Sequence, residues 1–170
     1  MIANGDFELD PAPVGSSSCF VVQLPSGWQS SAGLTNLVSS NCQAWGGTGV
    51  AAPSGKNYLA VQSGSGGGSI LKQTVSVPPE LVGLSLRLQF YMSKRIENTL
   101  PSTSVAVIVN NVVLRTISLT NGFTLYTVNT PAATSTMTVQ FNDVSPVTSD
   151  YSYLIDTITL SLAMPPTSKF

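Results

Sequence analysis

The sequence predicts an all-β protein, an antiparallel β-sandwich, and three patterns support this prediction. Apolar and polar residues alternate with a period of two along much of the chain. The alternating segments are short, and Gly, Pro and Ser separate them at regular intervals, which is typical of sandwiches and barrels. With 170 residues, of which 42% are apolar, the chain is long enough for one domain with a substantial core.

Several short segments are expected to be strands because they alternate and end at turn residues. In chain order they lie near 2–9, 20–24, 57–62, 69–77, 123–129 and 151–162. The stretch Ser63–Ser69, rich in Gly, has a strand-like segment on each side. We therefore interpret it as a flexible loop inside the domain. It is not a phosphate-binding loop, since no Gly-Lys-Ser/Thr sequence follows.

The clearest strand is expected at 84–92, where alternation separates an apolar face from a polar face. The apolar face consists of Leu84, Leu86, Leu88, Phe90 and Met92. The polar face consists of Ser85, Arg87, Gln89 and Tyr91. The same pattern predicts a strand at 136–141. Residues 104–119 are expected to form a hairpin that turns at Asn110-Asn111, because Asn tolerates a positive φ.

These segments predict a single sandwich domain over 1–163, followed by an extended tail over 164–170. Their shared register predicts which side chains point into the core. These are Leu86, Leu88, Phe90, Val107, Val139, Phe141 and Ile158.

The composition argues against nucleic acid as a partner. Charged residues make up only 9% of the chain, and the net charge is −1. The seven Lys and Arg residues are scattered, whereas binding to phosphates requires clustered cations that displace counterions. A charged membrane surface is disfavoured for the same reason. No apolar run approaches the roughly 20 residues of a membrane span.

The beginning of the chain bears on its compartment. Segment 2–9 already contains acids and a Gly, so it does not resemble a secretory signal. Either a signal has been removed ahead of Met1, or the protein is made and assembled in the cytosol. Cys19 and Cys42 are the only cysteines. They form either a disulfide, which would stabilise the fold by roughly 3 kcal/mol, or two buried free thiols.

The side chains available argue against an enzyme. The sequence contains no His, which removes Ser-His-Asp and Cys-His triads, most zinc sites and the usual general base near neutral pH. A glycosidase needs only two facing carboxylates. However, Glu80 and Glu97 lie in expected turns, and Asp143 and Asp150 flank an expected loop. We therefore predict a non-catalytic protein.

Several motifs resemble galactose-binding-like jelly rolls, a group that includes carbohydrate-binding modules of the xylan- and glucan-binding type. In the family's order these are Asn4-Gly5-Asp6-Phe7-Glu8, Ser26-Gly27-Trp28, the strands at 56–61 and 70–75, and the closing strand at 154–160. The resemblance covers nearly the whole chain. It implies a jelly-roll fold, but this fold hosts many unrelated functions.

The resemblance also implies a structural calcium held by Glu8 and Asp156, and calcium suits such oxygen ligands. Strict alternation places Asp156 on the apolar face of Leu154, Ile158 and Leu160, where a carboxylate needs a partner. Alternation also places Glu8 opposite its apolar neighbours, so the two acids would meet only at a sandwich edge. The alternative is that Asp156 accepts backbone N–H bonds from the N-terminal segment.

The polar face of segment 84–92 is the candidate glycan site. Arg87, Gln89 and Tyr91 lie side by side there, and an aromatic ring flanked by hydrogen-bonding groups suits a sugar. We expect Tyr126 and Gln140 to join them from other strands. The alternatives are an ordinary outer face of a sheet or a surface that packs on another subunit. Trp28 is expected to pack in the core, and Trp45 is expected to lie exposed on a loop.

Two functions follow from these expectations. The first is a non-catalytic glycan-binding module. The second is a structural or surface component of a larger assembly such as a virus particle, which the neutral surface rich in Ser, Thr and Asn also suits. The expected partner is accordingly a glycan or a neighbouring protein subunit, and the expected location is extracellular or on a virion surface.

Overall fold

The computed structural model describes residues 1–11, 19–40, 42, 51–63, 68–95, 103–145 and 151–163. The described part of the chain is almost entirely β, and its single helix is a 3-10 turn, η1 (Pro79–Leu81). The strands are β1 (Phe20–Val22), β2 (Gln29–Ser31), β3 (Gly33–Ser39), β4 (Asn57–Ser63), β5 (Ile70–Ser76), β6 (Ser85–Lys94), β7 (Ser104–Val109), β8 (Val112–Ser118), β9 (Thr124–Ala132), β10 (Thr136–Asp143) and β11 (Ser152–Leu162). Within these residues, no helix is long and apolar enough to cross a membrane.

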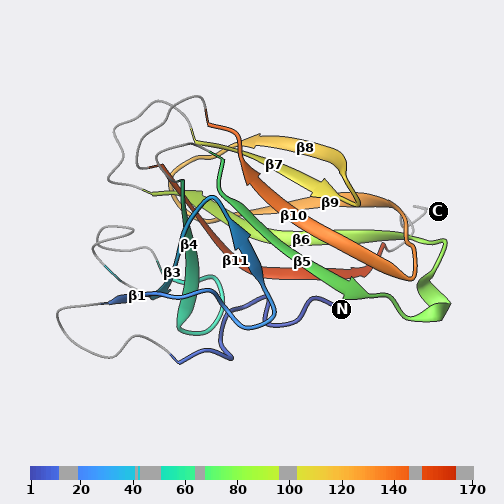
Figure 1. The fold of residues 1–170 in the computed structure, drawn as a ribbon, viewed down its shortest axis with the longest axis horizontal. Coiled ribbons are helices and arrows are strands. Elements are labelled where there is room, and N and C mark those ends of the chain that lie inside the picture. Colours follow the sequence, from blue (N-terminus) through green and yellow to red (C-terminus); the bar gives the residue numbers. More distant parts are fainter. Residues whose placement is uncertain are drawn as a thin grey trace, which may run out of the picture.

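The strands form two antiparallel sheets that pack face to face, which confirms the predicted sandwich (Figure 1). The six-stranded sheet has the order β1-β3-β4-β11-β6-β9, and the five-stranded sheet has the order β2-β5-β10-β7-β8. The hairpin between β7 and β8 turns at Asn110 and Asn111, as predicted, with φ of 50° and 65°. The predicted tail at 164–170, Trp45, and residues 64–67 of the Gly-rich stretch lie outside the described residues.

The core lies between the sheets, and all seven residues expected to point inward are buried in it. Phe90 of β6 lies at its centre, with its ring edge-to-face against Phe141 at 5.0 Å and stacked on Tyr126 at 5.9 Å. Leu84 is an exception to the predicted alternation. It precedes β6 and is 44% exposed, because it lies in the turn after η1.

The N-terminal segment departs from the prediction of a strand near 2–9. Asn4 and Phe7 have positive φ, 48° and 59°, so the chain turns twice. The segment nevertheless lies along β11, where the Ile158 N–H donates to the Gly5 carbonyl at 2.8 Å. Phe7 packs against Trp28, which is buried as expected and donates from Nε1 to the Asn4 carbonyl.

Strand β3 was not predicted, and its burial explains why. Four consecutive residues of β3, from Thr35 to Val38, are buried, so the strand does not alternate in sequence. Leu37 belongs to the main core, whereas Val38 belongs to a second cluster on the outer side of the six-stranded sheet. The other buried members of that cluster are Cys42, Tyr58, Ala60 and Leu154. A strand covered on both faces has lost the pattern that reveals strands in sequence.

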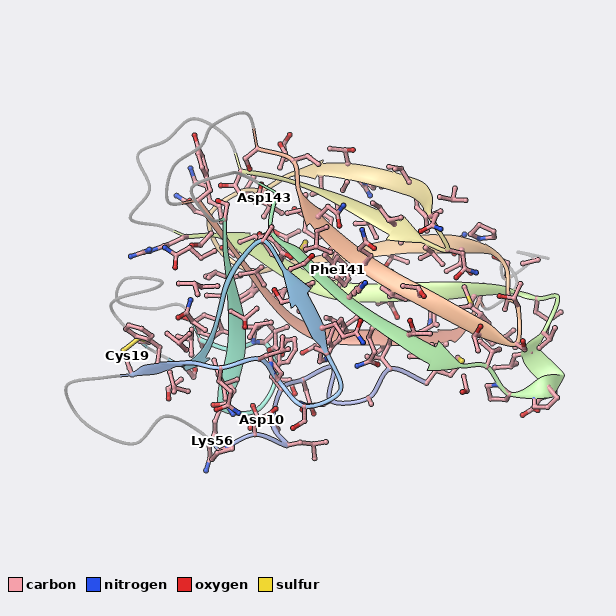
Figure 2. The ribbon with its side chains drawn as sticks, in the orientation of Figure 1. Asp10, Cys19, Lys56, Phe141 and Asp143 are labelled. Atoms are coloured by element: carbon pink, nitrogen blue, oxygen red, sulfur yellow. A yellow bond between two sulfur atoms is a disulfide. The ribbon has the colours of Figure 1, made fainter. Side chains whose placement is uncertain are left out.

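Cys19 and Cys42 form a disulfide across a separation of 23 residues (Figure 2). Of the two alternatives left open by the sequence, the structure therefore selects the disulfide. It joins the start of β1 to the segment after β3, beside the second cluster. Phe123 extends this cluster by an edge-to-face contact with Tyr58 at 5.5 Å.

Reducing this disulfide is expected to lower the free energy of unfolding by about 3 kcal/mol, because the unfolded chain regains the entropy of an open loop. Urea denaturation with and without reductant measures the difference, and the chain has no other cysteine for the reductant to attack. The double variant Cys19→Ala/Cys42→Ala should lose reductant sensitivity. An unchanged midpoint after complete reduction would contradict the prediction.

Candidate functional site

Strand β6 presents Arg87, Gln89 and Tyr91 on the outer side of the six-stranded sheet, and we call these three side chains the β6 face. Each is half-buried, and the residues between them point into the core. Their neighbours on β9 are Asn129, Thr127 and Leu125. Their neighbours on β11 are Ser161, Thr159 and Asp156. The β6 face therefore lies within a wider surface of hydroxyl, amide and apolar groups.

Two members of the β6 face have informative surroundings. Gln89 donates from Nε2 to the Thr127 hydroxyl at 3.2 Å, which leaves its carbonyl oxygen free to accept a hydrogen bond from a ligand. Leu125, directly opposite Tyr91, is 47% exposed. The Tyr91 ring and the Leu125 side chain together form an apolar patch beside the polar groups.

The structure does not bring Tyr126 and Gln140 to this face, so the expectation that they join it is wrong. Tyr126 pairs with Phe90 and points to the inner side of the sheet, where the Arg115 guanidinium lies 5.9 Å above its ring. Gln140 belongs to β10 of the other sheet and donates to the Asn142 side chain at 2.7 Å. Alternation assigns a face within one strand, but not the sheet to which a strand belongs.

A bulge in β11 determines the position of Asp156. The pairing with β6 shifts between Asp156 and Thr159, and Thr157 has a φ of 51°. Asp156 is therefore fully buried on the outer side, opposite Tyr91, whereas Ile158 joins the core. The expectation that Asp156 shares a face with Ile158 and Leu160 is wrong, because an inserted residue reverses the alternation.

Glu8 and Asp156 bind the same turn, residues 54–57. Asp156 accepts the N–H groups of Ser54 at 3.1 Å and of Thr157 at 2.6 Å. Glu8 accepts those of Lys56 at 2.8 Å and Asn57 at 2.7 Å through one oxygen, Oε1. The hydrogen-bonded alternative for Asp156 is thus realised, although with donors from the turn and its own strand and not from the N-terminal segment.

Burial and the nearby Glu8 carboxylate both disfavour the charged form of Asp156. Burial raises the pKa of Asp156 to about 7 against the opposing effect of its backbone hydrogen bonds, and the Glu8 carboxylate raises it further. Carboxylate oxygens are ligands of the kind that calcium prefers. Among the described residues, no cluster of three or more His, Cys, Asp or Glu side chains could hold a metal. Backbone or water oxygens would have to complete any shell.

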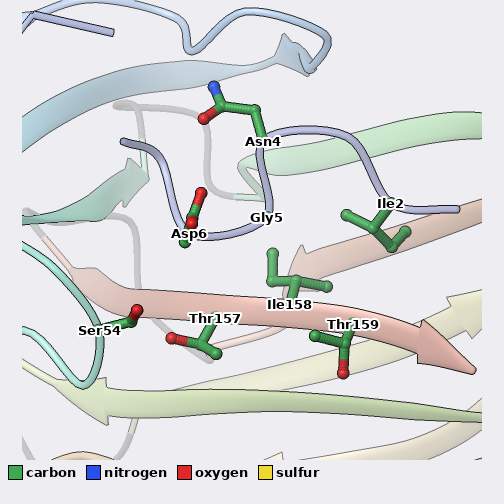
Figure 3. A pocket seen from close by; sticks show the side chains of 8 residues that line it. All are labelled: Ile2, Asn4, Gly5, Asp6, Ser54, Thr157, Ile158 and Thr159. Atoms are coloured by element: carbon green, nitrogen blue, oxygen red, sulfur yellow. The ribbon is translucent and has the colours of Figure 1, made fainter. Parts of the chain in front are cut away.

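A cavity of about 290 Å³ adjoins this region, and sequence patterns did not reveal it. Figure 3 shows it between the N-terminal segment, the turn at Ser54 and β11 beyond the bulge. The residues that line it are Ile2, Asn4, Gly5, Asp6, Ser54, Thr157, Ile158 and Thr159. Most of them lie in turns or at the bulge, where no periodicity marks a residue.

Asp10 holds the N-terminal segment beside this cavity, a role that no sequence pattern indicated. Its buried carboxylate accepts from the side chains of Asn4 at 2.7 Å, Gln23 at 3.2 Å and Ser26 at 2.9 Å. Hydrogen bonds to a charged group are stronger than neutral ones. Asp10 therefore holds Asn4, a residue of the cavity wall, in place.

Comparison with solved structures identifies the architecture. A family 61 carbohydrate-binding module, solved in complex with β-1,4-galactotriose, matches with a TM-score of 0.61 at 15% identity, over 95% of this chain and 97% of that chain. The chain has the jelly-roll fold of carbohydrate-binding modules. The family 22 xylan-binding domain of Paenibacillus barcinonensis Xyn10C shares this fold with a TM-score of 0.55 at 12% identity, over 82% and 88% of the two chains.

The jelly roll also matches an adhesin. The K2 cleaved adhesin domain of Lys-gingipain has a TM-score of 0.61 at 15% identity, over 94% of this chain and 97% of that chain. No protein-family model matches the sequence, and no curated protein matches it. At these identities the carbohydrate-binding-module likeness establishes the fold, and function has to be argued from the site.

Proposed function

We infer that this protein is a non-catalytic carbohydrate-binding module that binds glycan on the β6 face. The observation that carries the proposal is the β6 face itself on a jelly roll of the carbohydrate-binding-module type. The ring of Tyr91, continued by Leu125, suits the apolar face of a sugar ring. Arg87 and Gln89 supply donors and an acceptor for its hydroxyls.

The carboxylates support a binding role over a hydrolytic one. A glycosidase needs two carboxyl groups that face each other across an open cleft. Asp10, Asp143 and Asp156 are buried, and each accepts backbone or side-chain hydrogen bonds. Glu8 is bound to the turn at 56–57. These acids serve the fold, so the site is proposed to bind without chemistry.

The disulfide and the fold support a location outside the cell. Disulfides persist in oxidising compartments and are rare in the cytosol. We accordingly place the proposed module in an extracellular setting, where glycans are the available partners.

Replacing Tyr91 by Ala is expected to lower glycan affinity by at least about tenfold, because aromatic residues at the centre of a contact carry much of the binding energy. A glycan array that contains β-1,4-galactans and xylans identifies the ligand, and calorimetry then compares the variants. Affinity of the parent should be modest, since an open sheet face leaves much of the ligand in water. The melting temperature should change little.

Gln140→Ala is the matched control, because Gln140 lies on the outer side of the other sheet. It should leave affinity unchanged. If Gln140→Ala removes binding while Tyr91→Ala does not, the site lies on the five-stranded sheet. A blank array would overturn the proposal in favour of the second function.

That second function, a surface component of an assembly, is supported by the edge strand β1. Segment 19–25 contains no charged residue, and Val22 is 61% exposed on β1, which is the outermost strand of its sheet among the described residues. Monomeric proteins usually protect such an edge with charges or a cover. Sedimentation at increasing protein concentration distinguishes the two functions, because a module stays monomeric whereas an assembly protein associates.

Glu8 and Asp156 are further proposed to hold a structural calcium ion, with Glu8 Oε2 and the remaining lone pairs of Asp156 as ligands. A calcium ion would neutralise two carboxylates that otherwise repel each other. The ion would act on stability, since it would tie the N-terminal segment to β11 and the turn at 54–57. Its removal is treated in the Discussion.

A further inference from the structure

The cavity beside β11 has a backbone that is held in costly conformations. Thr157 has a positive φ of 51°, and for a β-branched residue this is a true outlier. Asn4, on the facing wall, has a φ of 48°. Such conformations persist where the surroundings enforce them, and they gather at binding sites. The Asp10 carboxylate and the bulge in β11 enforce them here.

Gly5 sets the width of the cavity. A Cβ atom at this position would lie 2.1 Å from the Ile158 carbonyl oxygen, a distance at which the backbone must move. Only glycine therefore allows the N-terminal segment to approach β11 and form the Ile158–Gly5 hydrogen bond. The cavity is thus held at a fixed width by backbone contacts.

The lining of the cavity suits one particular ligand chemistry. The lining has three hydroxyl residues, one amide, one carboxylate and two isoleucines, in that order Ser54, Thr157, Thr159, Asn4, Asp6, Ile2 and Ile158. Its volume is close to the lower end of the roughly 300–1,000 Å³ of small-molecule sites, which fits one sugar unit. The Asp6 carboxylate in the lining makes this corner unfavourable for an anion.

Thr159 of β11 links the cavity to the β6 face. Thr159 is exposed on the outer side of β11 and pairs with Gln89 of β6, so the two side chains are neighbours. Gln89 is the middle residue of the β6 face, between Arg87 and Tyr91. A glycan that lies over the β6 face therefore reaches Thr159, a residue of the cavity wall beside Gln89.

We propose that this cavity is a subsite that holds one neutral sugar unit beside Gln89 and discriminates against sugars that carry a carboxylate. The subsite rests on the proposed glycan-binding function and extends it to a choice of substrate. Asp6 sets the discrimination, and the Thr159 hydroxyl contributes a hydrogen bond to the sugar.

The test is an NMR titration of the full chain with D-galactose, D-xylose and D-glucuronate, followed at backbone amides. The neutral sugars should shift the amides of Asp6, Ser54 and Thr159, and glucuronate should not. Thr159→Val keeps the shape but removes the hydroxyl, and it should weaken neutral-sugar binding by roughly tenfold. Asp6→Asn should reduce the preference for neutral sugars over glucuronate, a readout that a purely structural role would not change.

Thr116→Val is the control, because Thr116 is an exposed strand threonine on β8 of the other sheet. It should leave all shifts unchanged, and melting curves confirm that each variant is folded. If Tyr91→Ala abolishes glycan binding while Thr159→Val and Asp6→Asn change neither affinity nor selectivity, the proposed function stands and the subsite is wrong. Cavity amides that respond to none of the three sugars would also overturn the subsite.

Discussion

Phe90→Ala is expected to lower the free energy of unfolding by about 3–5 kcal/mol, the range for removing a buried aromatic side chain. Phe90 is fully buried at the middle of β6 and contacts aromatic rings from both sheets, Phe141 and Tyr126. The substitution removes apolar contact and leaves a cavity that the rigid sheets fill only in part. Equilibrium denaturation monitored by circular dichroism measures the loss.

Leu84→Ala provides the matched control. Sequence alternation places Leu84 and Phe90 on one face, but Leu84 lies outside β6 and is largely exposed. Its replacement should change stability by no more than about 0.5 kcal/mol. Equal effects of the two substitutions would show that the core is not centred on Phe90.

Chelation of calcium is expected to lower the melting temperature, and added calcium should restore it. An ion that binds only the folded chain stabilises it by mass action, by about 2.7 kcal/mol at a hundred times its dissociation constant. Asp156→Asn should abolish this response, because the amide supplies no charge to the ion. Differential scanning calorimetry with chelator and with excess calcium measures the shift.

Asp10→Asn separates loss of calcium from loss of a buried carboxylate. Asp10 is buried and hydrogen-bonded like Asp156, but its partners are the side chains of Asn4, Gln23 and Ser26 and the Ser26 N–H. This variant should be less stable and still respond to calcium. A metal-free parent that melts at one temperature with or without calcium would leave Asp156 with its hydrogen bonds only.

Sequence patterns predicted those parts of the fold in which one face of a strand meets water. In β6 the alternation of Leu86, Leu88 and Phe90 with Arg87 and Gln89 predicted both faces correctly. Strand β3 escaped prediction because the core covers one of its faces and the second cluster covers the other. Apolar and polar residues alternate in a strand only when one of its faces is exposed, so a strand buried on both faces shows no alternation.

The site was harder to predict because it depends on contacts between distant segments. The bulge after Asp156 reverses the alternation, and no residue type announces it in advance. Glu8 and Asp156 meet through a turn that lies far from both in sequence. Gln140 was separated from the β6 face by sheet order, which local pattern does not contain.

The N-terminal segment joins the two sheets, and this affects how the domain bears mechanical load. Ala3 exchanges two hydrogen bonds with the Gln73 side chain of the five-stranded sheet, at 2.8 and 2.9 Å. Two residues later, Gly5 accepts from Ile158 of the six-stranded sheet. A pulling force applied at residue 1 is therefore divided between both layers from the outset. The sandwich is therefore expected to resist such traction as one body until these bonds break.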